Sequence, residues 1–239
     1  MLNKIYFFAI CTLLAGLYSS NSLYADHRRF VWTYEYQIMN AGQAEFESYN
    51  TVSASNTDDF ENTSSTELNY EFEFGMNKFF DFAIYQTFKQ LPNESIRYDG
   101  FKLRWRFKIG EKNDYFLDPL IYIEYIGKPN FAKHKIEPKL ILAKDIGNFT
   151  IALNPYLEAE YDKEWELLPE YSLGISYQIN PLMNLGIEAK GSKEGNYIGP
   201  TIAHGEDHLW VAMGALFHYG YVEANKPKFS ARLLFGIHL

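Results

Sequence analysis

Between Phe101 and Ile109, apolar or aromatic residues alternate with cations, in the order Phe-Lys-Leu-Arg-Trp-Arg-Phe-Lys-Ile. An alternation of period two places each class of side chain on its own face of a β-strand, whereas a helix would mix the two classes. In a soluble sandwich the apolar face would form a core and the cations would meet water. In a membrane barrel the apolar face would meet lipid and the cations would line the lumen.

The same alternation recurs to the end of the chain and predicts an all-β protein. Thirteen extended segments are expected, at 30–38, 43–52, 67–74, 80–88, 101–109, 117–125, 136–143, 149–160, 171–179, 185–189, 197–203, 209–217 and 229–239. No stretch shows a convincing helical period.

The predicted connections alternate between short turns and longer, more polar loops. Turns are expected at 40–42, 75–78, 110–113, 145–148, 180–181 and 204–207, and loops at 53–64, 89–100, 127–135, 162–168, 191–196 and 219–228. Outer-membrane barrels show this alternation, with short periplasmic turns, long outer loops and an even number of strands. With the turns and the C-terminus in the periplasm, the strand that begins at Gln43 is the first of 12 in an antiparallel transmembrane β-barrel.

The segment from Phe30 to Ile38 is then left over, and we interpret it as an extended N-terminal segment, inside the lumen or below it. Its aromatic residues Trp32, Tyr34 and Tyr36 are candidates for a lumen plug. An alternative is that two predicted segments form one bent strand, because predicted boundaries carry errors of about two to four residues.

The first 25 residues have the pattern of a secretory signal peptide. Lys4 precedes an apolar run, and small residues lead to a predicted cleavage site after Ala25. We expect residues 26–41 to form the N-terminal segment and 42–239 the barrel. Cys11 leaves with the signal, so the mature chain has no cysteine for disulfides or metal sites. No later apolar stretch is long enough for a membrane helix, so any insertion must use strands.

Composition adds two constraints. Aromatic residues make up 18% of the chain, with 19 Tyr and 19 Phe, which is typical of strands and of the aromatic belts of membrane barrels. The formal net charge of −8 argues against nucleic acid as a partner. No cofactor is predicted.

The last nine residues, Ala231 to Leu239, resemble the C-terminal strand of Gram-negative outer-membrane barrels, with apolar side chains at alternate positions. That resemblance implies recognition by the barrel assembly machinery, although the family usually ends in Phe and this chain ends in Leu239. More loosely, the turn ending in Gly42 and the strands after it resemble the barrels of the phenol-degradation-pathway (MetA-type) family. That likeness implies passage of small molecules through the outer membrane, with membrane lipids as partners.

Five prolines are the main argument for the soluble alternative, a periplasmic sandwich or lipocalin-like barrel. Proline removes a hydrogen bond from the ladder, and a closed barrel has no free edge. All of them share the parity of the apolar residues in their strands, so in a membrane barrel they would face lipid, at bulges: Pro119, Pro138, Pro155, Pro169 and Pro200.

If the chain is a membrane barrel, the other parity lines the lumen with charges. The predicted lumen-lining residues are Glu67, Glu71, Glu73, Lys102, Arg104, Arg106, Lys108, Glu124 and Glu158. Facing acidic and basic walls would create a transverse field that sorts solutes by charge and dipole. Alternatively, the ions pair across strands and close the lumen.

Candidate catalytic groups are few. Ser172 and His218 have the residue types of an outer-membrane lipid-modifying enzyme, but no Gly-x-Ser-x-Gly motif or complete nucleophile, base and orienting group can be assembled. His204 and His208 flank a predicted turn and are expected to be solvated. The sequence therefore predicts a passive or gated channel for small solutes, with a closed structural barrel or a lipid enzyme as alternatives and no catalytic or metal site.

Overall fold

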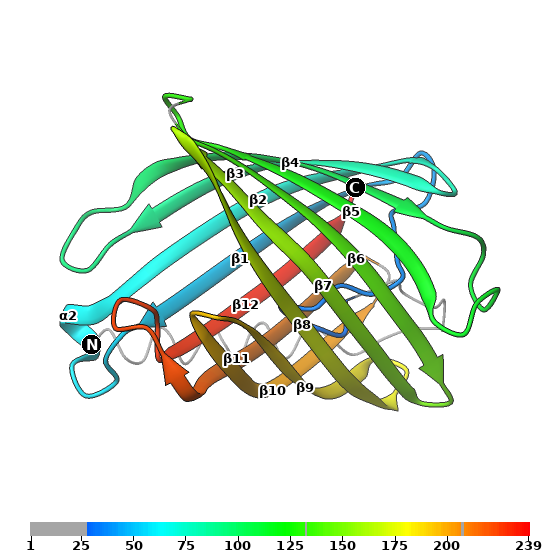
Figure 1. The fold of residues 1–239 in the computed structure, drawn as a ribbon. Helices are drawn as coiled ribbons and strands as arrows, with labels where there is room; N and C mark the ends of the chain where they lie inside the picture. Colours follow the sequence, from blue (N-terminus) through cyan, green and yellow to red (C-terminus); the bar gives the residue numbers. More distant parts are fainter. Residues whose placement is uncertain (1–27, 132, 207) are drawn as a thin grey trace.

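The computed structural model describes residues 28–131, 133–206 and 208–239, and in these residues twelve antiparallel strands close into one barrel (Figure 1). Each strand pairs with its neighbours in the chain, and the first pairs with the last. The predicted signal peptide, residues 1–25, lies outside the described residues. The strands are β1 (Ala44–Ala54), β2 (Ser64–Asn77), β3 (Phe80–Gln90), β4 (Arg97–Lys108), β5 (Asp118–Gly127), β6 (His134–Ile146), β7 (Phe149–Asp162), β8 (Glu164–Asn180), β9 (Met183–Ser192), β10 (Gly195–Glu206), β11 (Leu209–Val222) and β12 (Phe229–His238).

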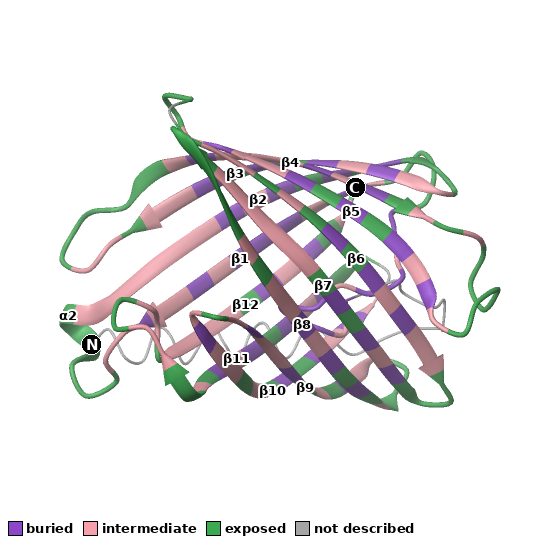
Figure 2. Cartoon of the chain, in the orientation of Figure 1, coloured by how far each residue is buried: buried purple, intermediate pink, exposed green. Residues whose placement is uncertain are grey.

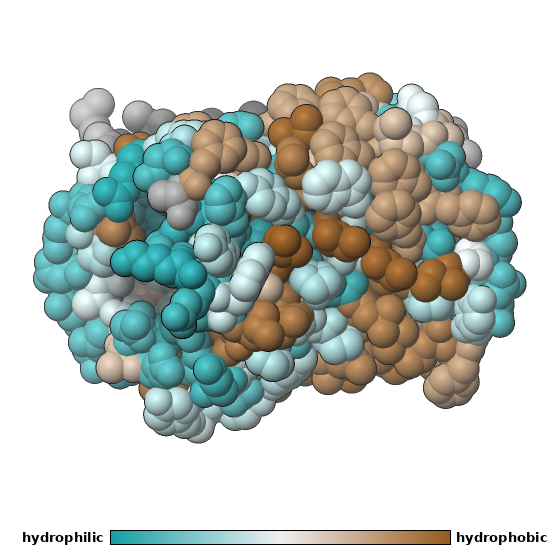
Figure 3. Space-filling model, turned by 45° about the horizontal axis from the view of Figure 1, so that its top comes forward, coloured by the Kyte–Doolittle hydropathy of each residue, from teal (hydrophilic) through white to brown (hydrophobic). Residues whose placement is uncertain are grey.

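The predicted alternation is visible as bands of different burial along the strands (Figure 2). On β9, Ile187 faces outward and is 59% exposed, while the next residue, Glu188, is buried. Figure 3 shows hydrophobic side chains over much of the barrel wall and hydrophilic side chains at one end. An apolar wall around buried charges is the reverse of a soluble protein and is the pattern of a membrane barrel.

Aromatic side chains stack on the outside near both ends of the wall. Near one end, Phe80 and Phe107 stack with their ring centroids 4.7 Å apart. Near the other end, Phe217 contacts Phe229 at 5.2 Å. Aromatic girdles at the two interfaces of the bilayer are typical of outer-membrane barrels. We call the end with the C-terminus the turn end and the opposite end the loop end.

Besides the strands, the described residues contain one short helix, α2 (Phe60–Thr63), in the connection between β1 and β2. No helix among the described residues has the length and apolar character that crossing a membrane would require.

The five prolines lie on outward-facing positions, as predicted, and some of them interrupt the hydrogen-bonded ladder. Between β6 and β7 the pairing is broken on both sides of Lys139 and Tyr156, which leaves gaps at Pro138 and Pro155. Between β10 and β11 the pairing is broken at Pro200. The barrel thus tolerates proline by giving up local pairings on its lipid-facing side.

Two predicted loops at the loop end are wrong, because they are tight hairpins. β7 runs to Asp162 and β8 starts at Glu164, with Lys163 alone between them at φ +74°. Likewise, β9 ends at Ser192 and β10 begins at Gly195. Around Lys163 the side chains of both strand faces are exposed. Where a hairpin extends into water both faces are polar, and polarity no longer distinguishes strand from loop.

The short turn predicted at 110–113 is also wrong, because the whole connection from Ile109 to Leu117 lies outside the strands. Two carboxylates stabilise it by accepting backbone N–H groups: Asp114 accepts from Glu111 at 2.7 Å and Asp118 from Asn113 at 2.8 Å. These local bonds offer the backbone an alternative to the strand ladder. The alternation of short and long connections is therefore only approximate in this barrel.

Residues 28–41, which are the described part of the predicted N-terminal segment and keep that name below, enter the barrel interior and contribute to both of its buried apolar clusters. The predicted extended segment Phe30–Ile38 forms no strand. In Figure 1 the dark blue trace crosses the inside of the barrel behind β7 and β8. A Cβ on Gly75 would lie 1.9 Å from the carbonyl oxygen of Asn40, so only glycine leaves room for the segment there.

The outward apolar face gives a test of membrane insertion. Replacing Ile187, at the middle of β9, with Lys should destabilise the barrel in phospholipid vesicles by about 2–4 kcal/mol, because the charge would lie near the bilayer midplane. The same change at Phe116, which is 91% exposed in the connection before β5, should change stability by less than about 0.5 kcal/mol. Denaturant unfolding from vesicles measures both values, and equal effects would contradict the lipid-facing assignment.

Candidate functional site

A single carboxylate holds the N-terminal segment across the lumen. Glu188 of β9 accepts the backbone N–H of Val31 at 2.6 Å and those of Trp32 and Thr33 at 2.8 Å each. Three consecutive N–H groups that turn toward one carboxylate form a concave anion site, of the kind called a nest. Irregular backbone has no strand partner inside a barrel, so this carboxylate satisfies donors that would otherwise be buried and unpaired.

Three further side chains of the wall bind the backbone of the segment. The amide of Asn154 on β7 accepts the N–H of Tyr34 at 2.6 Å and donates to its carbonyl at 3.0 Å. Nearer the turn end, the N–H of Met39 donates to Asp81 at 3.0 Å and to Glu73 at 3.2 Å. The segment is therefore attached at its beginning, middle and end by side chains from several strands.

Tyr36 joins the segment to the connection between β4 and β5. Its hydroxyl donates to the carbonyl of Gly110 at 2.7 Å. Burial, followed by the negative charges of Asp118 and Glu111, raises the pKa of Tyr36 to about 12. The hydroxyl therefore remains a donor throughout the neutral pH range.

Glycines in the wall make room for the large side chains of the segment. A Cβ on Gly174 of β8 would lie 2.6 Å from the ring of Phe30. One on Gly214 of β11 would lie 2.8 Å from the ring of Trp32. Real Cβ atoms do not approach neighbours so closely, which means that the wall and the segment are complementary in shape.

Each predicted plug aromatic meets a cation of the wall. Arg232 lies 5.4 Å from the ring of Trp32, Lys139 lies 4.9 Å from that of Tyr34, and Lys108 lies 5.1 Å from that of Tyr36. Cations over aromatic faces attract them by about 0.5–2 kcal/mol. Such contacts bind the segment without requiring it to form a strand.

On the opposite side of the lumen, charges of β2, β3 and β4 form an ion-pair layer, which we define as Glu71, Glu73, Asp81, Arg104 and Arg106. Arg104 contacts Glu71 at 2.7 Å and Glu73 at 2.5 Å. Arg106 contacts Asp81 at 2.5 Å and also pairs with Glu73. All five residues are buried.

The ion pairs depend on a small residue on the strand between the partners. Ala83 of β3 lies in register with both Glu73 of β2 and Arg104 of β4. Because its side chain is only a methyl group, the guanidinium reaches over β3 to the carboxylate. The neighbouring inward residue, Tyr85, accepts a hydrogen bond from Arg104 at 2.8 Å.

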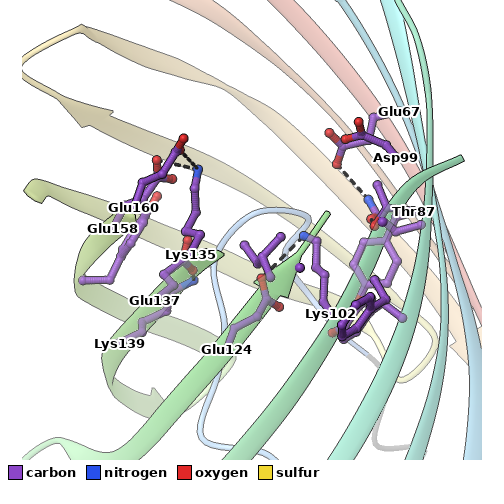
Figure 4. Close-up of a pocket in the computed structure, with 18 of the residues that line it drawn as sticks. Glu67, Thr87, Asp99, Lys102, Glu124, Lys135, Glu137, Lys139, Glu158 and Glu160 are labelled. Atoms are coloured by element: carbon purple, nitrogen blue, oxygen red, sulfur yellow. Dashed lines mark hydrogen bonds and ion pairs between the residues drawn. The ribbon is translucent and has the colours of Figure 1, made fainter. Parts of the chain in front are cut away.

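The lumen is wider toward the loop end, where a cavity of about 490 Å³ lies above the N-terminal segment (Figure 4). We call it the central cavity. Trp32 and Tyr34 contribute to its lining, together with charged side chains of β2 to β9 and β12. Toward the turn end, by contrast, a space of only about 30 Å³ lies beside the segment.

Most lysines of the central cavity are paired. Lys102 lies 3.5 Å from Glu124, Lys139 lies 3.0 Å from Glu137, and Lys135 lies 2.6 Å from Glu158. Figure 4 shows the two groups of charged side chains facing each other across the cavity. At its rim, the hydrogen bonds that Lys133 donates to Asp162 and Glu160 raise the pKa of Lys133. These pairs leave the centre of the cavity open.

The structure places the predicted lumen residues at three levels. The residues that border the central cavity are Glu67, Lys102, Glu124 and Glu158. The residues in the ion-pair layer, away from this cavity, are Glu71, Glu73, Arg104 and Arg106. Lys108 lies nearest the turn end, beside Tyr36. Their effect on a solute stays a prediction.

Sequence reasoning did not single out Asn154, Lys190 or Arg232. All of them share the inward parity of their strands, which was the available signal. The residues around each of them are uncharged or show only a weak alternation of polar and apolar positions, however. Only the fold brings the three side chains to the N-terminal segment. Of the two candidate catalytic residues, Ser172 donates to the amide of Asn154 at 3.3 Å, which accounts for it as part of the segment's binding site.

The ion-pair layer predicts how the barrel responds to charge removal. Arg104→Met leaves Glu71 and Glu73 buried with one cation fewer, so we expect a loss of about 3–5 kcal/mol in the free energy of unfolding. Adding Glu71→Gln should recover part of this loss. Asp58→Asn, in the exposed connection before α2, is the control and should change stability by less than about 0.5 kcal/mol. Equal stability of all variants would contradict the pairing.

Comparisons with known proteins find the same architecture in outer-membrane channels. No family model matches the chain, and no curated protein matches it in sequence. An outer-membrane channel from Pseudomonas putida F1 has a TM-score of 0.62 at 10% identity, over 85% of this chain and 98% of the channel. The KdgM porin, in complex with disordered oligogalacturonate, has a TM-score of 0.55 at 9% identity, over 81% and 97%. The NanC porin has 0.55 at 8%, over 80% and 98%. The chain therefore has the fold of a 12-stranded outer-membrane barrel.

Proposed function

We propose that this protein is an outer-membrane channel for small solutes, and that its own N-terminal segment narrows the lumen. The proposal rests on one observation: the N-terminal segment separates the central cavity from the turn end. Irregular backbone crosses the lumen there, attached through Glu188 and Asn154 and not built into the sheet. Backbone held by side chains can be released without breaking a strand, whereas a lumen filled by strand side chains has no such element.

The channel would be oriented as outer-membrane barrels are, with the turn end in the periplasm and the loop end outside. Residues 1–25 would direct export, and residues 42–239 would form the barrel after the N-terminal segment. The C-terminal strand pairs with β1 to close the barrel, so its recognition by the assembly machinery would precede closure. Membrane lipids would surround the outward apolar face.

The similar solved structures support a channel because channels and porins share this architecture, including one in complex with an oligogalacturonate. The likeness of the sequence to the phenol-degradation family stays a prediction about the solute. A closed structural barrel is the second candidate, and the buried ion-pair layer favours it. A role in lipid chemistry has no comparable observation in its favour.

Single-channel conductance tests the proposal directly. The mature chain from residue 26, refolded into a planar bilayer, should conduct less than a chain that begins at Gly42, because the N-terminal segment obstructs the lumen. The heat-dependent shift of a folded barrel on a gel confirms that both chains are folded. If neither folded chain conducts, the result would favour the closed structural barrel.

A variant of the full mature chain tests the attachment. Glu188→Ala removes the acceptor of three N–H groups, and hydrogen bonds to a charged group contribute about 1.5–3 kcal/mol each. We expect longer or more frequent open events in current recordings. Glu194→Ala, which removes an ion pair with Lys226 at the loop end, is the matched control and should leave the open times unchanged. Identical traces would show that the attachment does not restrict conduction.

A further inference from the structure

A second cavity, of about 430 Å³, lies beside the central cavity near the loop end. We call it the hydroxyl cavity, because six of the residues that line it carry hydroxyl groups: Thr51, Ser53, Ser55, Thr63, Ser65 and Ser230. They come from β1, β2, β12 and the connection that contains α2. Its volume lies within the range of about 300–1,000 Å³ that is typical of small-molecule sites.

The charges that line the hydroxyl cavity are unbalanced. Lys89, Lys190 and Arg232 face a single carboxylate, Glu67. Among the described residues, no carboxylate lies within the 4.0 Å of an ion pair from any of these cations. The lysines that line the central cavity but not the hydroxyl cavity differ in this respect, because each of them has a carboxylate at 2.6–3.5 Å. The hydroxyl cavity therefore carries an excess of positive charge.

Arg232 is held in a fixed position at the boundary of the two cavities. Its Nε donates to Thr51 at 2.8 Å and its Nη1 to the carbonyl of Val31 at 3.4 Å, while the guanidinium lies over Trp32. A guanidinium has five N–H donors, and these contacts use two of them. A planar fork of donors matches the two oxygens of a carboxylate.

Lys190 is the other cation common to the two cavities, and it also borders a third, smaller space beside Trp32. Lys190 follows Glu188 by two residues on β9, so the ammonium of Lys190 and the carboxylate of Glu188 lie on the same face of that strand. Glu170 also borders two of these spaces, but it forms no ion pair with Lys190 within 4.0 Å. A half-buried charge without a direct ion-pair partner is unfavourable in a low dielectric, and an anionic ligand would relieve that cost.

The hydroxyl groups give the cavity a second kind of selectivity. Each serine or threonine hydroxyl both donates and accepts a hydrogen bond. Ser53 and Ser230 bond to each other at 2.8 Å, while no hydrogen bond occupies the hydroxyls of Ser55 and Ser65 among the described residues. A wall of this type suits a solute with several hydroxyl groups better than an apolar ring.

We propose that the hydroxyl cavity binds a small polyhydroxylated carboxylate of the sugar-acid class. The carboxylate contacts Lys190 and Arg232, and the hydroxyl groups of the solute bond to the serines and threonines of β1 and β2. As the solute class of a channel, this inference rests on the function proposed above, whereas binding itself does not require conduction.

Titration calorimetry of the folded mature chain in detergent tests the site. The probes are D-glucuronate, D-glucose as its neutral analogue, acetate as an anion without hydroxyl groups, and phenol. We expect glucuronate to bind at least about tenfold more tightly than each other probe, a difference of about 1.4 kcal/mol. Glucose binding equal to glucuronate would overturn the role of the cations, and acetate binding equal to glucuronate would overturn the role of the hydroxyls. Preferential binding of phenol would overturn the proposed class.

Two variants locate the site. Lys190→Gln should weaken glucuronate binding by about tenfold or more, the loss of one charge-assisted contact. Lys78→Gln removes the same charge at the exposed turn end, where Lys78 pairs with Glu111, and should bind glucuronate as the unmodified chain does. Equal binding by both variants would overturn the assignment to the hydroxyl cavity.

A separate conductance measurement distinguishes the failure of this inference from the failure of the channel. Conduction by a chain that binds no glucuronate would overturn the site and leave the channel intact. Glucuronate binding by a folded chain that does not conduct, with or without its N-terminal segment, would support the site and overturn the channel.

Discussion

The contact of Glu188 with three consecutive backbone N–H groups is the interaction on which the interior depends. A barrel satisfies the backbone of its strands through the ladder, but a segment that crosses the lumen has no such partner. One carboxylate supplies acceptors for Val31, Trp32 and Thr33, and the amide of Asn154 continues the binding at Tyr34. Side chains of the wall thus replace the missing strand.

The same requirement explains the division of the lumen. Where charges are fully buried, on β2, β3 and β4, three carboxylates and two guanidinium groups form ion pairs across the small side chain of Ala83. Where the lumen widens, the pairs at the wall leave open space between them. At the boundary with the hydroxyl cavity, Arg232 and Lys190 have no carboxylate within 4.0 Å among the residues that the structure describes. Positive charge is therefore concentrated where a solute has room to bind.

Aromatic residues have two roles that differ only by position. On the outside, Phe80 and Phe107 stack near one edge of the apolar wall, as a lipid interface requires. Inside, Trp32, Tyr34 and Tyr36 contact cations because their ring faces attract positive charge, and the ring of Trp32 also packs against Gly214. A high aromatic content therefore does not by itself distinguish girdle from plug.

The sequence by itself determined the strands, because period two is a property of the chain. The alternation from Phe101 to Ile109 placed every cation of that strand on one face. The positions of the short turns, together with the even strand count of membrane barrels, left the first extended segment, 30–38, outside the barrel wall. The sequence did not predict the hairpins at Lys163 and at Ser192–Gly195. Both faces of a strand in water are polar, so these strand ends have the same polarity as a loop. Tertiary structure alone decided which inward charges meet. Arg104 finds Glu73 across β3, and Lys190 and Arg232, which are 42 positions apart, face one cavity. Pairing across a closed barrel depends on register and on the small residues between partners, and neither is encoded in the alternation of a single strand.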